Sequence, residues 1–143
     1  MNNRLNDIGL LIFRISISAF MMFGHGLGKL NRLFGGEEIK FFDPLGFGAS
    51  FSLGFAVLAE FFAAGLIILG IFTRLSSVTL IITMAVAAFL YHADDPFGTQ
   101  EKALMYLFSF ILLFLTGPGK YSLQTLISPK LENLNNKLKF FLH

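Results

Sequence analysis

Residues 51–72 read FSLGFAVLAEFFAAGLIILGIF, an apolar stretch interrupted by one charged side chain, Glu60. A helix rises about 1.5 Å per residue, so a stretch of this length crosses the ~30 Å hydrocarbon layer of a bilayer. Three more stretches have a similar length and character, at 8–28, 75–91 and 99–116. Their periodicity is not two, and lipid does not tolerate open sheet edges. We therefore predict an all-α integral membrane protein, a four-helix bundle.

The composition of the 143-residue chain supports this prediction. Hydrophobic residues make up 55% and charged residues 14%, with a mean hydropathy of +0.69, whereas about a quarter of a soluble domain is charged. The chain has no cysteine, which excludes disulfides, thiolate metal sites and a thiol relay carried by the chain itself. The net charge of +2 is small and scattered, so no nucleic-acid partner is expected.

The connections between the four stretches differ in length and polarity. Residues 29–50 mix charges with phenylalanines and glycines, and the aromatic content predicts that this loop folds back onto the membrane surface or the bundle. Thr73-Arg74 is expected to make a very short turn between the second and third helices. Residues 117–119 (Gly-Pro-Gly) end the fourth helix, because glycine and proline break regular structure.

The end of the chain differs from the rest. Ser128-Pro129 is typical of a helix N-cap followed by proline at the first helical position. After it, leucines and a phenylalanine recur at spacings of three and four among lysines. We predict that residues 124–143 form a C-terminal basic amphipathic helix at the membrane interface, appended to a transmembrane domain of residues 1–123. The alternative is a frayed tail, because the segment is short and rich in asparagine.

Four spans place both termini on one side of the membrane. Basic residues are more frequent on the cytoplasmic side of membrane proteins, and the side of the termini carries the basic excess, so both termini are predicted to be cytoplasmic. Its basic residues are Arg4, Arg74, Lys120, Lys130, Lys137 and Lys139.

Ionisable side chains inside membrane spans are costly and usually face a protein interior or a cavity. Arg14, His25 and Lys29 fall on one face of the first helix, since His25 and Lys29 are an i, i+4 pair and Arg14 lies about three turns earlier. Counted from the side of the termini, Glu60 lies between Arg14 and the His25–Lys29 pair. We therefore predict one buried polar cluster, open toward the opposite side, made of Arg14, His25, Lys29, Glu60, His92 and Glu101.

Three interpretations of this cluster stay open. It can hold the helices in register without a ligand, as buried ion pairs often do. His25, His92 and a carboxylate can bind a metal ion, but they lie on different helices without a recognisable spacing, so neither a metal nor a nucleotide cofactor is expected. The third interpretation is a pocket for a small lipid-soluble molecule with a polar head, in which His25 and Glu60 exchange protons and phenylalanines supply apolar walls.

A small-residue motif, Gly24-x-x-x-Gly28, lies in the first span. Such motifs permit close approach of two helices. We predict a packing role for these two glycines.

Several elements together resemble the DoxX family of small four-helix bacterial membrane proteins, over residues 8–123. The resemblance lies in their order and spacing. The elements are Arg14 followed by FGHGLGKL (23–30), EFFAAG (60–65) leading into LGIFTR (69–74), residues 84–92, EKAL (101–104) and GPGKYSL (117–123). The resemblance implies a multi-pass protein of the bacterial cytoplasmic (inner) membrane.

The resemblance also implies a function. Relatives in this family include the small membrane subunit of an archaeal thiosulfate:quinone oxidoreductase, and others resemble components of redox or detoxification systems for thiols, quinones and catechols. We expect a membrane component that binds a quinone, a quinol or a similar small aromatic molecule in the polar cluster. Arg14 and Lys29 would face a quinone carbonyl, His25 and Glu60 would exchange protons, and His92 with Glu101 would line the entrance.

Two other functions stay open. The chain can be a non-catalytic membrane anchor or assembly subunit that docks a soluble oxidoreductase or sulfurtransferase, which the absence of a redox-active residue pair and the basic tail favour. A small-solute transporter is less favoured, because four short helices leave little room for alternating access, although a homo-oligomer would supply it. The sequence does not decide whether the chain catalyses a reaction.

Overall fold

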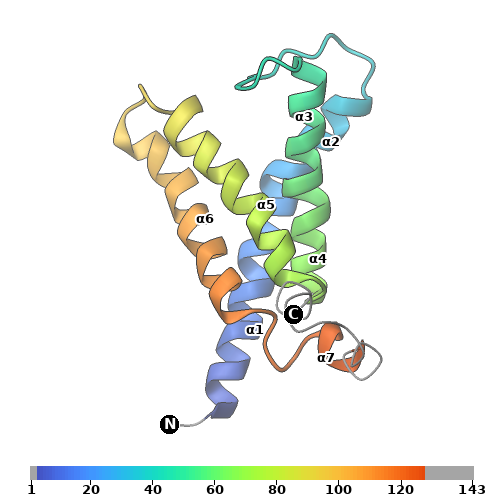
Figure 1. The fold of residues 1–143 in the computed structure, drawn as a ribbon, viewed down its shortest axis with the longest axis vertical. Coiled ribbons are helices and arrows are strands. Elements are labelled where there is room, and N and C mark those ends of the chain that lie inside the picture. The colour runs from blue at the N-terminus through green and yellow to red at the C-terminus, as the bar shows by residue number, and fades with distance from the viewer. Residues whose placement is uncertain (1–2, 128–143) are drawn as a thin grey trace.

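The computed structural model describes residues 3–127, which are helical apart from the long loop at 35–48 and shorter connections (Figure 1). The first helix runs without a break through α1 (Asn3–Met21), a π-helical segment η1 (Met22–Gly26) and α2 (Leu27–Phe34). It therefore continues past the predicted end at residue 28, since Lys29 to Phe34 keep helical geometry. An all-helical membrane fold is confirmed.

The second and third helices are joined by a three-residue turn. The second consists of α3 (Ala49–Val57), η2 (Leu58–Ala63) and α4 (Ala64–Leu69). The third consists of α5 (Thr73–Val86) and η3 (Ala87–Tyr91).

The prediction that Thr73-Arg74 forms this turn was wrong. The turn is residues 70–72, because Gly70 adopts the left-handed conformation (φ 69°) that ends a helix, and Thr73 already begins α5.

The fourth long helix is α6 (Phe97–Thr116), and a short α7 (Leu123–Ile127) follows it. Three helices are long and apolar enough to cross a membrane: Arg4–Phe34, Ala49–Leu69 and Thr73–Tyr91. The charged residues of α6, Glu101 and Lys102, lie in its first two turns, and α6 packs along α5. The predicted amphipathic helix after residue 127 lies outside the described residues.

The helices run antiparallel, so their connections gather at two ends of the molecule (Figure 1). The start of α1, the turn at 70–72 and α7 lie at one end, called here the turn end. The loop of residues 35–48 and the turn of residues 92–96 lie at the other, called here the loop end.

The core lies between the helices and contains both small and large apolar side chains. Ala64, Ile67, Leu80, Phe110 and Leu113 are fully buried. Many phenylalanines and leucines instead point outward and are half exposed or more, the arrangement that lipid-facing helices require.

The loop of residues 35–48 does fold back onto the bundle, through one of its phenylalanines. The ring of Phe42 lies 5.3 Å from that of Tyr91 in η3. Asp43 accepts hydrogen bonds from the backbone N–H groups of Gly46 (3.1 Å) and Gly48 (2.7 Å) and from the hydroxyl of Ser52 (2.8 Å). The donation from Gly48 lowers the pKa of Asp43 below its usual value. The hydrogen bonds to ionised Asp43 therefore stabilise the loop fully at a pH above the usual pKa of aspartate. This stabilisation is lost as the pH falls through the lowered pKa.

The two glycines of the predicted packing motif do not make the helix contact. A Cβ atom at Gly24 or Gly28 would have no heavy atom within 4 Å, whereas one at Gly26 would overlap the backbone carbonyl of Glu60. The motif prediction was wrong because η1 changes the helical phase at this level, so Gly26 rather than its neighbours faces the second helix.

Gly26→Ala is therefore expected to destabilise the protein, because the added methyl must push the first two helices apart. Overpacking of this kind costs about 1–3 kcal/mol, and thermal unfolding in detergent should show a lower midpoint. Gly28→Ala is the matched control, with open space around its Cβ position. Equal midpoints for the two variants would contradict the assigned contact.

Candidate functional site: a buried ion pair between the first two helices

Among the described residues, Glu60 is the one acidic side chain that is buried. It sits in η2, near the middle of the second helix, and is 3% exposed. Its Oε2 atom accepts a hydrogen bond from the Nζ atom of Lys29 in α2, forming an ion pair. A carboxylate in such surroundings needs a compensating charge, and Lys29 supplies it from the neighbouring helix.

The close approach of η1 and η2 brings these charges together. Gly26 has no side chain, so the backbone of the first helix lies directly against the carbonyl of Glu60. His25, the residue before it, is half-buried and lies within electrostatic range of Glu60, Lys29 and Lys102. Short π-helical segments often mark functional sites, and here one carries His25 and another carries Glu60.

The third component of the site comes from α6, and the sequence analysis missed it. The ring of Tyr106 meets the ring of His25 edge to face, with centroids 5.5 Å apart and an interplanar angle of 86°. Tyr106 also stacks on the buried Phe110 at 6.2 Å. Lys102 lies one helical turn before Tyr106. Tyr106 is the one tyrosine of the fourth span, a signal that its sequence already contained.

These residues offer a defined set of polar groups beside aromatic surfaces. Lys29 donates hydrogen bonds, Glu60 accepts them, and His25 does either according to its tautomer. Lys29 is 25% exposed while Glu60 is almost sealed, so the pair can be reached from the lysine side. Among residues 3–127, no three His, Cys, Asp or Glu side chains come close enough together to hold a metal ion.

Arg14 does not belong to this group, contrary to the predicted cluster of six. It is 2% exposed at the turn end, about 16 Å below His25 by helical rise. Its Nη1 atom donates to the carbonyl of Pro118 and its Nη2 atom to the carbonyl of Tyr121 at 2.9 Å. Carbonyls beyond the end of a helix need donors and attract positive charge, so backbone oxygens take the place that Glu60 was expected to fill.

His92 and Glu101 also lie apart from the ion pair. The Nδ1 atom of His92 is 2.6 Å from Oδ2 of Asp95, and its ring lies 4.6 Å from that of Tyr91. Glu101 is exposed in the first turns of α6. Within the described part of the chain, neither side chain hydrogen-bonds to His25, Lys29 or Glu60. The structure thus joins three of the six predicted residues.

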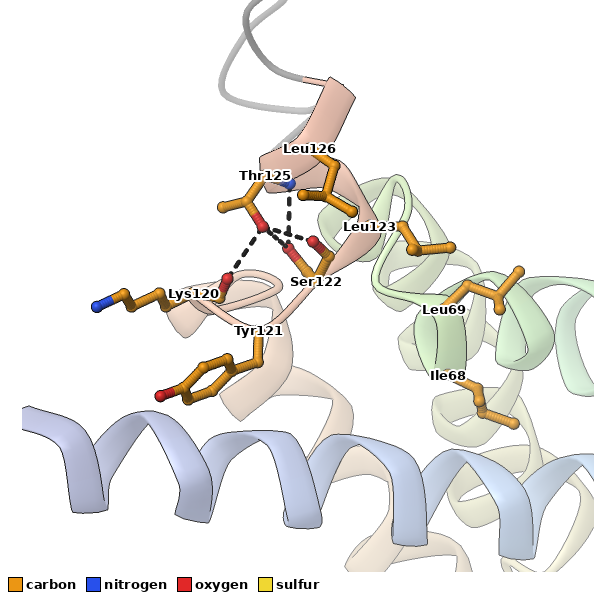
Figure 2. A pocket seen from close by; sticks show the side chains of 8 residues that line it. All are labelled: Ile68, Leu69, Lys120, Tyr121, Ser122, Leu123, Thr125 and Leu126. Atoms are coloured by element: carbon orange, nitrogen blue, oxygen red, sulfur yellow. Dashed lines mark hydrogen bonds between the residues drawn. The ribbon is translucent and has the colours of Figure 1, made fainter.

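A shallow pocket of about 470 Å³ lies at the turn end, between α4 and α7 (Figure 2). Hydroxyl groups of Ser122 and Thr125, two of its lining residues, bond to each other at 3.2 Å. Lys120 and Tyr121 point away from the leucines on its opposite side (Figure 2). No converging set of charged groups lines this pocket among the described residues, so the ion pair is the stronger candidate. The lining residues are Ile68, Leu69, Lys120, Tyr121, Ser122, Leu123, Thr125 and Leu126.

Comparison with known proteins identifies a family and relatives of this chain. The family model of DoxX matches residues 9–93, which include the whole of the Lys29–Glu60 pair and His25. Inner membrane protein YqjF of Escherichia coli (strain K12) is 29% identical over 131 residues, covering 89% of this chain and 98% of that protein. An uncharacterized protein of Haemophilus influenzae (strain ATCC 51907 / DSM 11121 / KW20 / Rd) is 32% identical over 142 residues, covering 94% and 93%. No solved structure matches the chain.

The position of Arg14 predicts a role in stability. Arg14→Gln removes two hydrogen bonds from a charged donor, each worth about 1.5–3 kcal/mol, and leaves the carbonyls of Pro118 and Tyr121 without these donors. We expect a lower thermal midpoint, with the binding of any ligand at the Lys29–Glu60 pair retained at low temperature.

The matched control is Arg32→Gln, since Arg32 is exposed on α2. If Arg14→Gln instead unfolds like the wild type and loses ligand, Arg14 belongs to the site after all.

Proposed function

The chain belongs to the DoxX family, and from that premise we propose that it is a bacterial inner-membrane component of a redox or detoxification system. In this proposal the Lys29–Glu60 pair, with His25 and Tyr106, binds a quinone, a quinol or a similar small aromatic molecule. The name of the related inner membrane protein YqjF supports the location. The chemistry of the site supports the ligand class.

The observation that carries the proposal is an ion pair that is buried on one side and open on the other. Glu60 is 3% exposed, whereas the side chain of Lys29 is 25% exposed. An incoming polar group can therefore approach the ammonium while the carboxylate stays within the bundle. Ionisable groups kept at such depth are costly, and in membrane proteins they usually serve a function.

The residues present fit the polar groups of a quinone or quinol. A carbonyl oxygen requires a donor, which Lys29 or His25 supplies, and a phenolic hydroxyl requires an acceptor, which Glu60 supplies. The rings of His25 and Tyr106 give an aromatic surface on which a flat ring can pack. When bound, a quinone would supply two-electron, two-proton redox chemistry, while His25 and Glu60 would hold or accept protons beside it.

The proposal is tested by mass spectrometry of the organic extract from gently purified protein. Wild-type protein is expected to carry a quinone above the level of the surrounding lipid, and Glu60→Gln is expected to lose most of it. The neutral amide of the glutamine carries no negative charge, so the variant has no ion pair with Lys29. The ammonium of Lys29 would then contact solvent, and its contact with the ligand would change.

The matched control is Glu101→Gln, which changes an exposed carboxylate on α6 and should leave the bound quinone in place. A thermal midpoint measured on each variant separates loss of ligand from loss of fold. Phospholipid alone in every extract would refute quinone binding and favour the non-catalytic anchor that docks a soluble oxidoreductase.

A further inference from the structure

The charges around the Lys29–Glu60 pair do not balance. Within the pair, the ammonium and the carboxylate neutralise each other. Lys102 in α6 is a second ammonium, and it lies within electrostatic range of His25, as both members of the pair do. The imidazole of His25 is either neutral or positive, so it adds no negative charge. Two ammonium groups therefore stand beside one carboxylate, and the site carries an excess of positive charge.

The place of Lys102 follows from helix geometry. Lys102 and Tyr106 are an i, i+4 pair in α6, so their side chains lie on one face of that helix. On this face the ring of Tyr106 meets the ring of His25, with centroids 5.5 Å apart. Glu101 is turned about 100° away around the helix, and among the described residues it is not one of the charges that act on His25. The helix α6 thus brings an ammonium to the site without its neighbouring carboxylate.

Both ammonium groups keep hydrogens that a ligand can use. Within residues 3–127 the ion pairs all join other residues, so Lys102 has no carboxylate partner in this part of the chain. Its side chain is exposed and has a flexible stem, so it can turn toward a bound group. Lys29 has three hydrogens on its ammonium and gives one of them to Glu60. The remaining hydrogens of both lysines are therefore available to oxygen atoms of a ligand.

The carboxylate of the site is shielded from an approaching anion. Glu60 is almost sealed, whereas a quarter of the Lys29 side chain is exposed, so a ligand from outside meets the ammonium first. Beside the cations lies an aromatic surface, because the ring of Tyr106 contacts His25 and stacks on Phe110. The site thus combines excess positive charge with a surface on which a flat ring can pack.

We propose that the ligand of this site is an aromatic carboxylate, such as a carboxylated quinol. Its ring packs against His25 and Tyr106. Its carboxylate accepts a hydrogen bond from Lys29 and is attracted by Lys102. This assignment rests on the proposed function in taking the Lys29–Glu60 pair as the ligand site, and it names the ligand class more narrowly. An uncharged quinone leaves the excess charge without a counterion, whereas an aromatic carboxylate matches both the charge and the ring surface.

The test compares hydroquinone, which is uncharged near neutral pH, with gentisate, the same ring with one carboxylate added. Calorimetry measures the binding of each to the full chain in an uncharged detergent at low ionic strength. The wild type is expected to bind gentisate about fivefold more tightly, because a charged acceptor hydrogen-bonds more strongly than a neutral one. Lys102→Gln should weaken gentisate binding roughly twofold to fivefold, the effect of one exposed charge, and leave hydroquinone binding unchanged.

Lys120→Gln is the matched control, because it removes an exposed lysine at the turn end and changes the net charge by the same amount. It should bind gentisate as the wild type does. Lys102→Arg keeps the charge and should keep the preference for gentisate. A thermal midpoint for each variant separates loss of ligand from loss of fold. Equal losses of gentisate binding in Lys102→Gln and Lys120→Gln would overturn the assignment.

The outcomes separate this assignment from the proposed function. Binding of hydroquinone without a preference for gentisate would overturn the aromatic carboxylate and leave the proposed function standing. If neither molecule binds, both fail. A phospholipid headgroup also carries negative charge, so gentisate binding is repeated with added phosphatidylglycerol or phosphatidylcholine. Displacement of gentisate by phosphatidylglycerol alone would assign the two lysines to a lipid headgroup and overturn the aromatic ligand.

Discussion

A carboxylate at the middle of an apolar helix must have a positive partner, and most of the features around Glu60 follow from that requirement. The partner, Lys29, belongs to a different helix, so the two helices must lie close together at this level. Gly26 permits the approach by presenting no side chain to the backbone of Glu60. The π-helical segments on both sides of the contact shift the helical phase, so His25 and Glu60 share one neighbourhood.

The second buried charge organises the opposite end. Arg14 has no carboxylate partner within residues 3–127 and is satisfied by carbonyls that follow α6. A backbone oxygen is a fixed part of the fold, whereas a side-chain carboxylate can exchange a proton or turn toward another group. The two charges therefore differ in what they can do. Arg14 joins the first helix to the segment after α6 at the turn end. Glu60, nearer the loop end, is a group that can exchange a proton.

The helices and the buried charges could be predicted from the sequence, because they depend on length and hydropathy. The contacts of individual side chains could not, because they depend on local geometry. Four apolar stretches gave the four long helices, and the expense of a buried charge singled out Glu60 and Lys29. The partner of Arg14 could not be predicted, because carbonyl groups occur at every residue and have no signature in a pattern. Gly26 was missed for a related reason, since an ideal helical wheel does not anticipate the phase shift of η1. Tyr106 was missed although it is the one tyrosine of the fourth span, because nothing in the sequence pairs it with His25.

The difference in exposure between the two partners bears on whether the ion pair is only structural. A pair that merely fixes helix register gains most when both charges are enclosed and fully hydrogen-bonded, because each partly solvated charge weakens the attraction. Here the carboxylate is sealed and the ammonium is not, and an imidazole lies against an aromatic ring beside them. An apolar pair of equal volume would hold the helices together at lower cost. The half-open pair lies where Gly26 brings the backbone of the first helix against that of Glu60, and it leaves Lys29 accessible to a group outside the bundle, as the proposed ligand requires.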